Sequence, residues 1–169
     1  KRLNDQFGDQ ADTFLGNLDK LDEFEELATD FGNDPTKMAT VFANPDKAEE
    51  LKRLNDQFGD QADTFLGNLD KLDEFEELAT DFGGDPTKMA TVFANPDKAE
   101  ELKRLNDQFG DQADTFLGNL DKLDEFEELA TDFGNDPTKM ATVFANPDKA
   151  EELKRLNDQF GDQADTFLG

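Results

Sequence analysis

The chain has 169 residues, a net charge of −25 at pH 7, and neither cysteine nor histidine. It therefore cannot form disulfides, and it lacks the usual ligands of zinc, haem and iron–sulfur centres. The negative charge disfavours binding to nucleic acids and to anionic membrane surfaces. No apolar run reaches the length of about 18 residues that membrane insertion requires. Because only 35% of the residues are hydrophobic, we expect a thin buried layer, which suits a rod better than a sphere.

The sequence is a tandem repeat. Residues 1–51 recur at 52–102 and 103–153, and residues 154–169 begin a fourth copy. The one aligned position that varies holds Asn33, Gly84 and Asn135. Such a period is typical of repeat arrays, in which each copy buries its apolar face against its neighbours. We expect one continuous array that is an excerpt of a longer protein.

The first helix of a complete copy is predicted to begin at Asn44-Pro45, an N-cap followed by proline at the first helical position. A narrow apolar stripe follows at helical spacing. It consists of Ala48, Leu51, Leu54 and Phe58. Gly59 can then supply the left-handed residue that often ends a helix.

Two further helices are predicted between Asp60 and Phe82. Asp60 can cap a short helix that ends at Gly67, and Asn68 can cap the next one. The latter has the widest apolar face of the copy, opposite an acidic face. Its apolar members are Leu69, Leu72, Phe75, Leu78, Ala79 and Phe82. In the alternative interpretation, Gly59 and Gly67, like Gly8 and Gly16, lie inside one long helix, because a helical glycine costs only about 1 kcal/mol.

Gly83-Gly84 is predicted to form a turn, and Asn33 and Asn135 fit the same turn because asparagine tolerates a left-handed backbone. Asp85-Pro86 then repeats the cap-plus-proline pattern before a fourth helix. No stretch alternates with the strand period of two. The sequence therefore predicts an all-α fold, an elongated helical-repeat solenoid or rod with two to four helices per copy.

One acidic cluster is a candidate binding site, and it recurs in the later copies. It consists of Asp19, Asp22, Glu23, Glu26 and Asp30. Carboxylates at this spacing share a helix face, and calcium prefers oxygen ligands. A rigid helix presents them in a row, however, and no loop of the EF-hand type is present. We therefore expect a solvated face with weak, diffuse screening by divalent cations, and no specific metal site.

No catalytic or cofactor-binding pattern was found. The glycine-rich phosphate-binding motifs are absent. Without histidine, cysteine or tyrosine, only lysine, threonine and carboxylates remain, and they form no recognisable constellation. The five phenylalanines per copy have the spacing of core residues. We expect neither enzymatic activity nor a cofactor.

These patterns predict a structural role, as a stalk, spacer or filament-forming segment of a large repetitive, extracellular or cell-surface protein. Its partners would be neighbouring copies and other molecules of the same chain. Because a repeat array without atypical end copies exposes repeat surface at both ends, head-to-tail association is expected, favoured by salt, divalent cations or mild acid.

Two other interpretations remain open at this point. One is a multivalent array that displays one weak protein or cation site per copy. The other is an artificial consensus repeat protein. The many Asn, Asp, Gly and Phe residues within the predicted helices argue against a sequence chosen for helix propensity.

Overall fold

The computed structural model describes residues 2–161 and residue 166. Over these residues the regular elements are α-helices and single 3₁₀ turns, and none is a strand. The prediction of an all-α fold is therefore confirmed. The chain divides into two compact units, Lys1–Thr80 and Asp81–Gly169.

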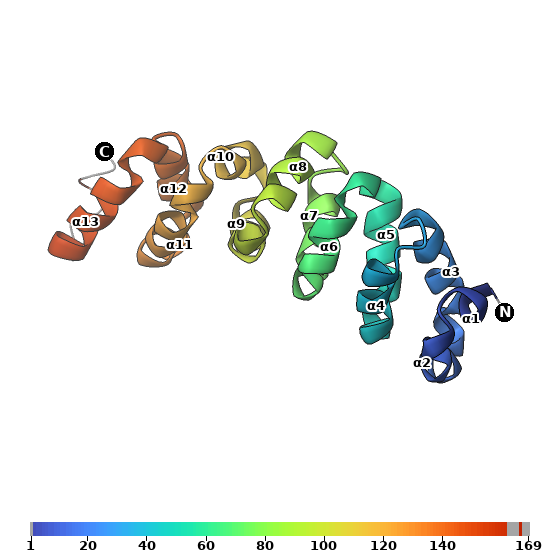
Figure 1. The fold of residues 1–169 in the computed structure, drawn as a ribbon. Coiled ribbons are helices and arrows are strands. Elements are labelled where there is room, and N and C mark those ends of the chain that lie inside the picture. Colours follow the sequence, from blue (N-terminus) through green and yellow to red (C-terminus); the bar gives the residue numbers. More distant parts are fainter. Residues whose placement is uncertain (1, 162–165, 167–169) are drawn as a thin grey trace. The chain divides into compact units, whose positions relative to one another are not determined.

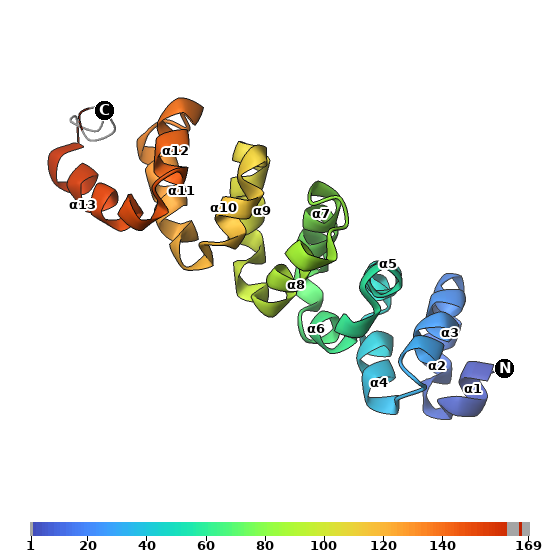
Figure 2. The same ribbon diagram turned by 90° about the horizontal axis from the view of Figure 1, so that it is seen from above.

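The first unit carries helices α1 to α7, the last of which reaches one residue beyond the unit boundary (Figures 1 and 2). They are α1 (Arg2–Gln6), α2 (Ala11–Gly16), α3 (Leu21–Asp30), α4 (Pro35–Ala43), α5 (Ala48–Phe58), α6 (Ala62–Gly67) and α7 (Leu72–Asp81). Short 3₁₀ turns link several of them, at Gly8–Gln10, Leu18–Lys20, Pro45–Lys47, Gly59–Gln61 and Leu69–Lys71. Helix α3 packs against α1, α4 and α5, and α6 packs against α4 and α5.

The second unit repeats this order of elements. Its helices are α8 (Pro86–Ala94), α9 (Ala99–Phe109), α10 (Ala113–Leu117), α11 (Leu123–Asp132), α12 (Pro137–Phe144) and α13 (Ala150–Phe160). The 3₁₀ turns lie at Pro96–Lys98, Gly110–Gln112, Leu120–Lys122 and Pro147–Lys149. Helix α11 packs against α9, α12 and α13, and α10 packs against α8 and α9. The same neighbours therefore meet in both units.

The predicted Asp-Pro caps are confirmed. The Asp85 carboxylate accepts hydrogen bonds from the backbone N–H groups of Thr87 at 2.8 Å and Lys88 at 3.3 Å. Proline occupies the first helical position, where its missing N–H is harmless. Asp34 and Asp136 cap α4 and α12 in the same way.

The variable position has a left-handed backbone in every copy, as predicted. Its φ is 57° at Asn33, 70° at Gly84 and 59° at Asn135. Asparagine and glycine are the residues that tolerate this region best. The one substitution among the copies therefore preserves the turn that joins α3 to α4, and its equivalents.

Gly59, which follows α5, and Gly67, which ends α6, act differently from the prediction. The chain does break here, so the alternative of one long helix is wrong. Gly59, however, has a φ of −13° and opens a 3₁₀ turn, and Gly67 is the last residue of α6. Neither is a left-handed C-terminal residue, because the chain continues directly into another short helical turn.

Asn44 and Asn68 precede a 3₁₀ turn at the N-cap position, and Pro45 is the first residue of its turn as predicted, but neither asparagine side chain makes a capping hydrogen bond. The Asn44 side chain donates its Nδ2 to the backbone oxygen of Thr40 at 2.9 Å, and Asn68 donates to Thr64 at 2.8 Å. Each amide therefore satisfies a free carbonyl at the end of the preceding helix. The predicted N-cap at Asp60 is wrong. Asp60 lies inside a 3₁₀ turn and precedes α6 by two residues.

Phenylalanine rings form the centre of each unit. In the first unit the ring of Phe42 meets those of Phe7, Phe14 and Phe24 edge-on, with centroids 5.1–5.3 Å apart. Phe144 meets the equivalent three rings in the second unit at 5.1–5.4 Å. Edge-to-face contacts add to the free energy gained from burial. The core assignment is therefore confirmed for the buried rings of both units, whereas Phe7 and Phe109 are only partly buried.

Candidate functional site

The predicted acidic cluster is divided between solvent and the neighbouring helix α5. Asp19 and Asp22 are exposed, and Glu23 is partly buried. Glu26 instead forms an ion pair with Lys52 at 2.7 Å, and Asp30 accepts a hydrogen bond from Asn55 at 3.0 Å. Two of the five carboxylates therefore hold α3 against α5. In the described part of the chain, no group of three or more potential ligands is placed to hold a metal ion.

The contact between α3 and α5 lies between residues of two successive repeat copies, and we call it the inter-copy seam. At its centre the buried Asn55 donates Nδ2 to Oδ2 of Asp30, which is itself exposed. The second unit repeats it between Asn106 and Asp81 at 2.9 Å. A hydrogen bond to a carboxylate is stronger than one between neutral groups. Because this bond joins two copies, we expect it to help set the register of one copy on the next.

The seam asparagines were missed by the sequence analysis. Asn55 follows Leu54 and lies four residues after Leu51, so it extends the apolar stripe of its helix. A polar residue at a stripe position is the signal that could have identified it. Its partner, Asp30, is 25 residues away, and that distance is beyond any helical pattern.

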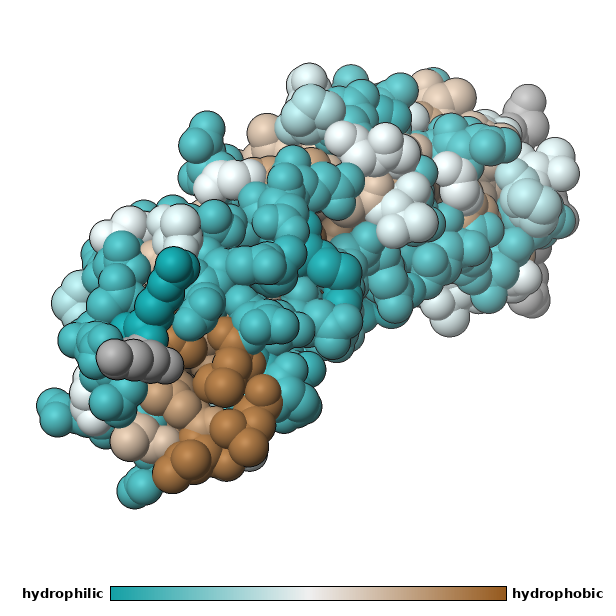
Figure 3. Space-filling model, turned by 90° about the vertical axis from the view of Figure 1, so that its right-hand side faces the viewer, coloured by the Kyte–Doolittle hydropathy of each residue, from teal (hydrophilic) through white to brown (hydrophobic). Residues whose placement is uncertain are grey.

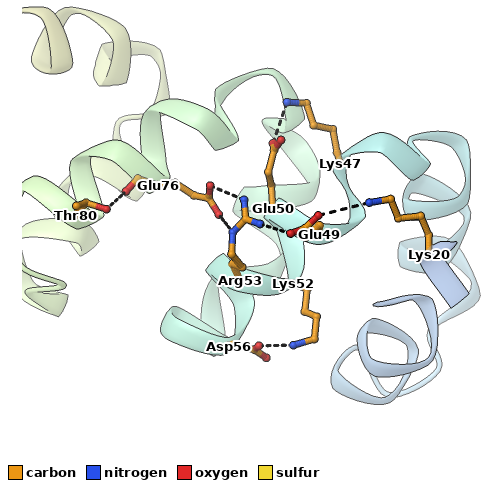
Figure 4. A network of polar contacts seen from close by, with 9 residues as sticks. All are labelled: Lys20, Lys47, Glu49, Glu50, Lys52, Arg53, Asp56, Glu76 and Thr80. Atoms are coloured by element: carbon orange, nitrogen blue, oxygen red, sulfur yellow. Dashed lines mark hydrogen bonds and ion pairs between the residues drawn. The ribbon is translucent and has the colours of Figure 1, made fainter. Parts of the chain in front are cut away.

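An arginine joins α5 to α7 on the surface of the first unit (Figure 4). Nε and Nη2 of Arg53 donate to the two carboxylate oxygens of Glu76 at 2.7 and 2.9 Å, and Nη1 donates to Glu49 at 2.8 Å. The hydrogen bonds that Arg53 donates to Glu76 raise the pKa of Arg53. In the second unit Arg104 binds Glu127 and Glu100 in the same geometry.

A lysine bridges the same helices from the start of α5. Lys47 Nζ lies 2.9 Å from Glu50 and 3.5 Å from Asp73 on α7, which is in the next copy. The hydrogen bond to Glu50 is the main reason why the pKa of Lys47 is raised. Lys98 repeats the arrangement in the second unit, and its pKa is raised chiefly by Glu101. Exposed ion pairs of this kind contribute only about 0–1 kcal/mol each, so they orient the helices more than they stabilise them.

Each unit also has a shallow groove lined in part by phenylalanine. The groove of the first unit has a volume of about 290 Å³ and lies between Gln6–Gln10 and the α4 residues Pro35, Ala39 and Phe42. That of the second unit, about 350 Å³, lies between Gln108–Gln112 and the equivalent residues of α12. Amide, carboxylate and aromatic groups line both grooves, so they present hydrogen-bonding groups beside aromatic rings.

No helix in the described residues has both the length and the apolar character needed to cross a bilayer. Comparison with models of known protein families, with curated proteins and with solved structures gave no match.

Proposed function

We propose that this chain is a non-catalytic structural segment, in which copies of the 51-residue repeat stack as an elongated helical solenoid or rod. The recurrence of the seam carries the proposal. The asparagine–aspartate bond appears at 3.0, 2.9 and 2.8 Å at three successive places, each 51 residues apart. Because every copy carries both halves of this bond, copies can be added without new chemistry. Such an array serves as a stalk, a spacer or a filament.

The charge of the chain supports this role. Each copy holds thirteen acidic and five basic residues. A uniform negative surface keeps long arrays apart and in solution. We place the protein outside the cell or at the cell surface. The complete reading frame tests this location: a secretion signal or surface anchor supports it, and an intracellular domain at either end of the array contradicts it.

Small-angle X-ray scattering on chains of two, three and six copies tests the elongated arrangement. A rod gains the same increment in maximum dimension with every added copy, whereas the radius of a globule rises with about the 0.38 power of its length. Thermal unfolding of the same series tests the coupling between copies. The melting temperature should rise by decreasing steps, because each added copy adds one more seam. Globular scaling of the dimensions would contradict the proposal.

A second candidate function is a multivalent binding array, favoured by the recurring grooves. In it, a weak ligand would gain affinity through many identical sites. Titration with the neutral apolar dye N-phenyl-1-naphthylamine tests whether the grooves bind anything. Ala39→Trp and Ala141→Trp together fill both grooves at exposed positions. Loss of bound dye in this variant supports the array, and unchanged binding excludes the grooves.

A further inference from the structure

The two shallow grooves are a property of the repeat, because a packed neighbouring copy fills neither of them. In the first unit, α6 of the following copy packs against α4, and Pro35 and Phe42 of α4 still line an open groove. In the second unit, α10 packs against α8 of the preceding copy, and the segment Gln108–Gln112 just before α10 still lines a groove of about 350 Å³. The grooves therefore remain open beside packed copies.

Each groove combines an aromatic ring with a carboxylate. Phe109 lines the groove of the second unit, is only partly buried, and meets Phe144 with ring centroids 5.2 Å apart. Asp111, two residues further on, lines the same groove and is exposed. Phe7 and Asp9 occupy the same places in the first unit. Among the described residues that line each groove, this aspartate is the only charged one.

The carboxylates of Asp9 and Asp111 are unpaired in the described part of the chain. Other acidic side chains of the repeat bind a basic one, as Asp63 binds Lys37 at 2.9 Å. Gln108, which lines the same groove as Asp111, adds an exposed amide whose oxygen can accept a further hydrogen bond. The groove therefore presents hydrogen-bond acceptors to a donor that comes from outside the chain.

The chain itself places a cation between a ring and a carboxylate at another point of the repeat. Lys37 Nζ lies 5.8 Å from the ring centroid of Phe31 and 2.9 Å from the carboxylate of Asp63 in the following copy. Lys88 repeats this arrangement one copy later. A cation is attracted both by the face of an aromatic ring and by a carboxylate. The grooves offer the same two kinds of group without a lysine or arginine among their described lining residues.

The charge of the chain favours a cationic occupant. The face drawn in Figure 3 is hydrophilic over most of its area, and acidic residues outnumber basic ones by 42 to 17 in the whole chain. A negative field of this kind raises the local concentration of cations. Arginine is the cationic side chain that suits the groove best, because its planar guanidinium stacks on aromatic rings and donates paired hydrogen bonds to one carboxylate.

We propose that the grooves bind arginine side chains from a basic peptide segment of a partner protein. The guanidinium stacks on the ring of Phe7 or Phe109 and donates to the carboxylate of Asp9 or Asp111. The inference goes beyond the structural role and rests on the second candidate function, for which it names the ligand. One groove binds weakly, and a segment with several arginines gains affinity because the groove recurs along the array.

Titration of the full chain with two labelled peptides, followed by fluorescence anisotropy, tests the class of ligand. The peptides are hexamers of alternating glycine and arginine, or glycine and lysine, so they carry the same charge. At about 0.15 M salt, charges more than about 8 Å apart are largely screened. The arginine peptide should bind at least about threefold more tightly than the lysine peptide. Equal affinities would overturn the inference.

Removal of the groove ring tests the stacking. The variant replaces the phenylalanine by leucine at the same position of each complete copy, which keeps an apolar side chain there. It carries Phe7→Leu, Phe58→Leu and Phe109→Leu. Circular dichroism first establishes that the variant is folded. The two peptides should then bind it with equal affinity, and an arginine preference that survives would overturn the inference.

Removal of the groove carboxylate is a second test, at exposed positions where the fold is not at risk. The variant carries Asp9→Asn, Asp60→Asn and Asp111→Asn. It should bind the arginine peptide at least about threefold more weakly. A matched control removes the same charge at exposed positions outside the grooves, and its affinity should change by less than about twofold. The control carries Asp46→Asn, Asp97→Asn and Asp148→Asn. Equal losses in both variants would overturn the inference.

Failure of this inference and failure of the second candidate function give different results. If the neutral dye binds the grooves and the arginine peptide shows no preference, the binding array stands and its arginine ligand is wrong. If neither the dye nor the peptide binds, both are wrong. The structural role is tested separately, by the growth of the dimensions of the chain with copy number.

Discussion

Two segments of identical sequence, Ala11–Leu21 and Ala62–Leu72, differ in how much apolar surface they expose. Leu15 and Leu18 are exposed in the first, whereas Leu66 and Leu69 are partly buried in the second. Both segments form the same short helix followed by the same 3₁₀ turn. The sequence of the segment thus sets its local conformation, whereas the helices that pack against it set how much of it is buried.

The comparison extends to polar groups. Asn55 is buried and bonded to Asp30, whereas Asn4, with the same flanking residues on both sides, is exposed. A hydrogen bond to a carboxylate contributes more when water is excluded from it. Identical side chains should therefore differ in energy from copy to copy, and each such difference can be measured by substitution.

The largest loss of stability is expected when a fully buried side chain is shortened. Phe75→Ala should lower the free energy of unfolding by about 3–5 kcal/mol, because the ring is fully buried on the apolar face of α7. Asp73→Ala, on the exposed face of the same helix, removes only the ion pair with Lys47 and should change it by less than about 1 kcal/mol. Urea denaturation followed by circular dichroism measures both. Equal effects would mean that the apolar face of α7 does not carry the stability.

The second prediction compares equivalent leucines. Leu72→Ala should cost about 3 kcal/mol, since Leu72 is fully buried. Leu21→Ala should cost about half as much, because Leu21 is only partly buried. Denaturation at low protein concentration keeps the molecules apart. If the two variants lose the same stability, the neighbouring copy contributes nothing to burial.

The third prediction concerns the seam asparagines. Asn55→Asp sets a second carboxylate against Asp30 and removes the donor, so the free energy of unfolding should fall by about 2 kcal/mol. Asn4→Asp makes the same chemical change at an exposed site and should have an effect within about 0.5 kcal/mol. Thermal unfolding at neutral pH distinguishes them. A tolerated Asn55→Asp would show that the bond does not fix the register of the copies.

The smallest effect on the free energy of unfolding is expected from the lysine–glutamate pairs, and it appears at alkaline pH. The pKa values of Lys47 and Lys98 are raised above 10.5 by their bonds to Glu50 and Glu101. The folded chain then holds these protons more tightly than the unfolded chain does. Their contribution is fully present below pH 10.5, the ordinary lysine value, and is lost as the pH rises through the folded-state pKa.

Denaturation across this pH range tests the lysine pairs. As the pH rises, the free energy of unfolding of the wild type should fall further than that of a variant that carries Glu50→Gln and Glu101→Gln. The additional loss should be up to about 1 kcal/mol for each lysine–glutamate pair. The advantage of the wild type over this variant should be constant below about pH 10. A difference that grows as the pH falls would assign the effect to other groups.

Features that depend on a few adjacent residues could be predicted from the sequence. Asp85-Pro86 predicts its cap because the carboxylate reaches N–H groups only two and three residues away. The left-handed turn at Gly84 follows from the backbone freedom of glycine. The apolar face of α7 follows from helical spacing, which brings Leu72, Phe75 and Leu78 together.

The N-cap predictions failed where two short-range hydrogen bonds compete for the same asparagine side chain. An asparagine such as Asn68 can cap the helix after it or close the helix before it, and both bonds are short-range. The pattern Asn-Leu-Asp favours the first, but the structure has the second, because a free carbonyl of Thr64 lies within reach of the Nδ2 donor. Sequence spacing alone does not rank these two bonds.

The sequence by itself determined the Asp-Pro starts of α4, α8 and α12, the left-handed turns before them, which faces are apolar, and that the same unit recurs. Only the tertiary structure decided that Asp30 meets Asn55, that Arg53 reaches Glu76, and that Leu18 remains exposed. The reason is the range of the interactions. Caps and turns are set by bonds within a few residues, whereas burial and seam contacts depend on helices some 25 residues apart that meet only after packing.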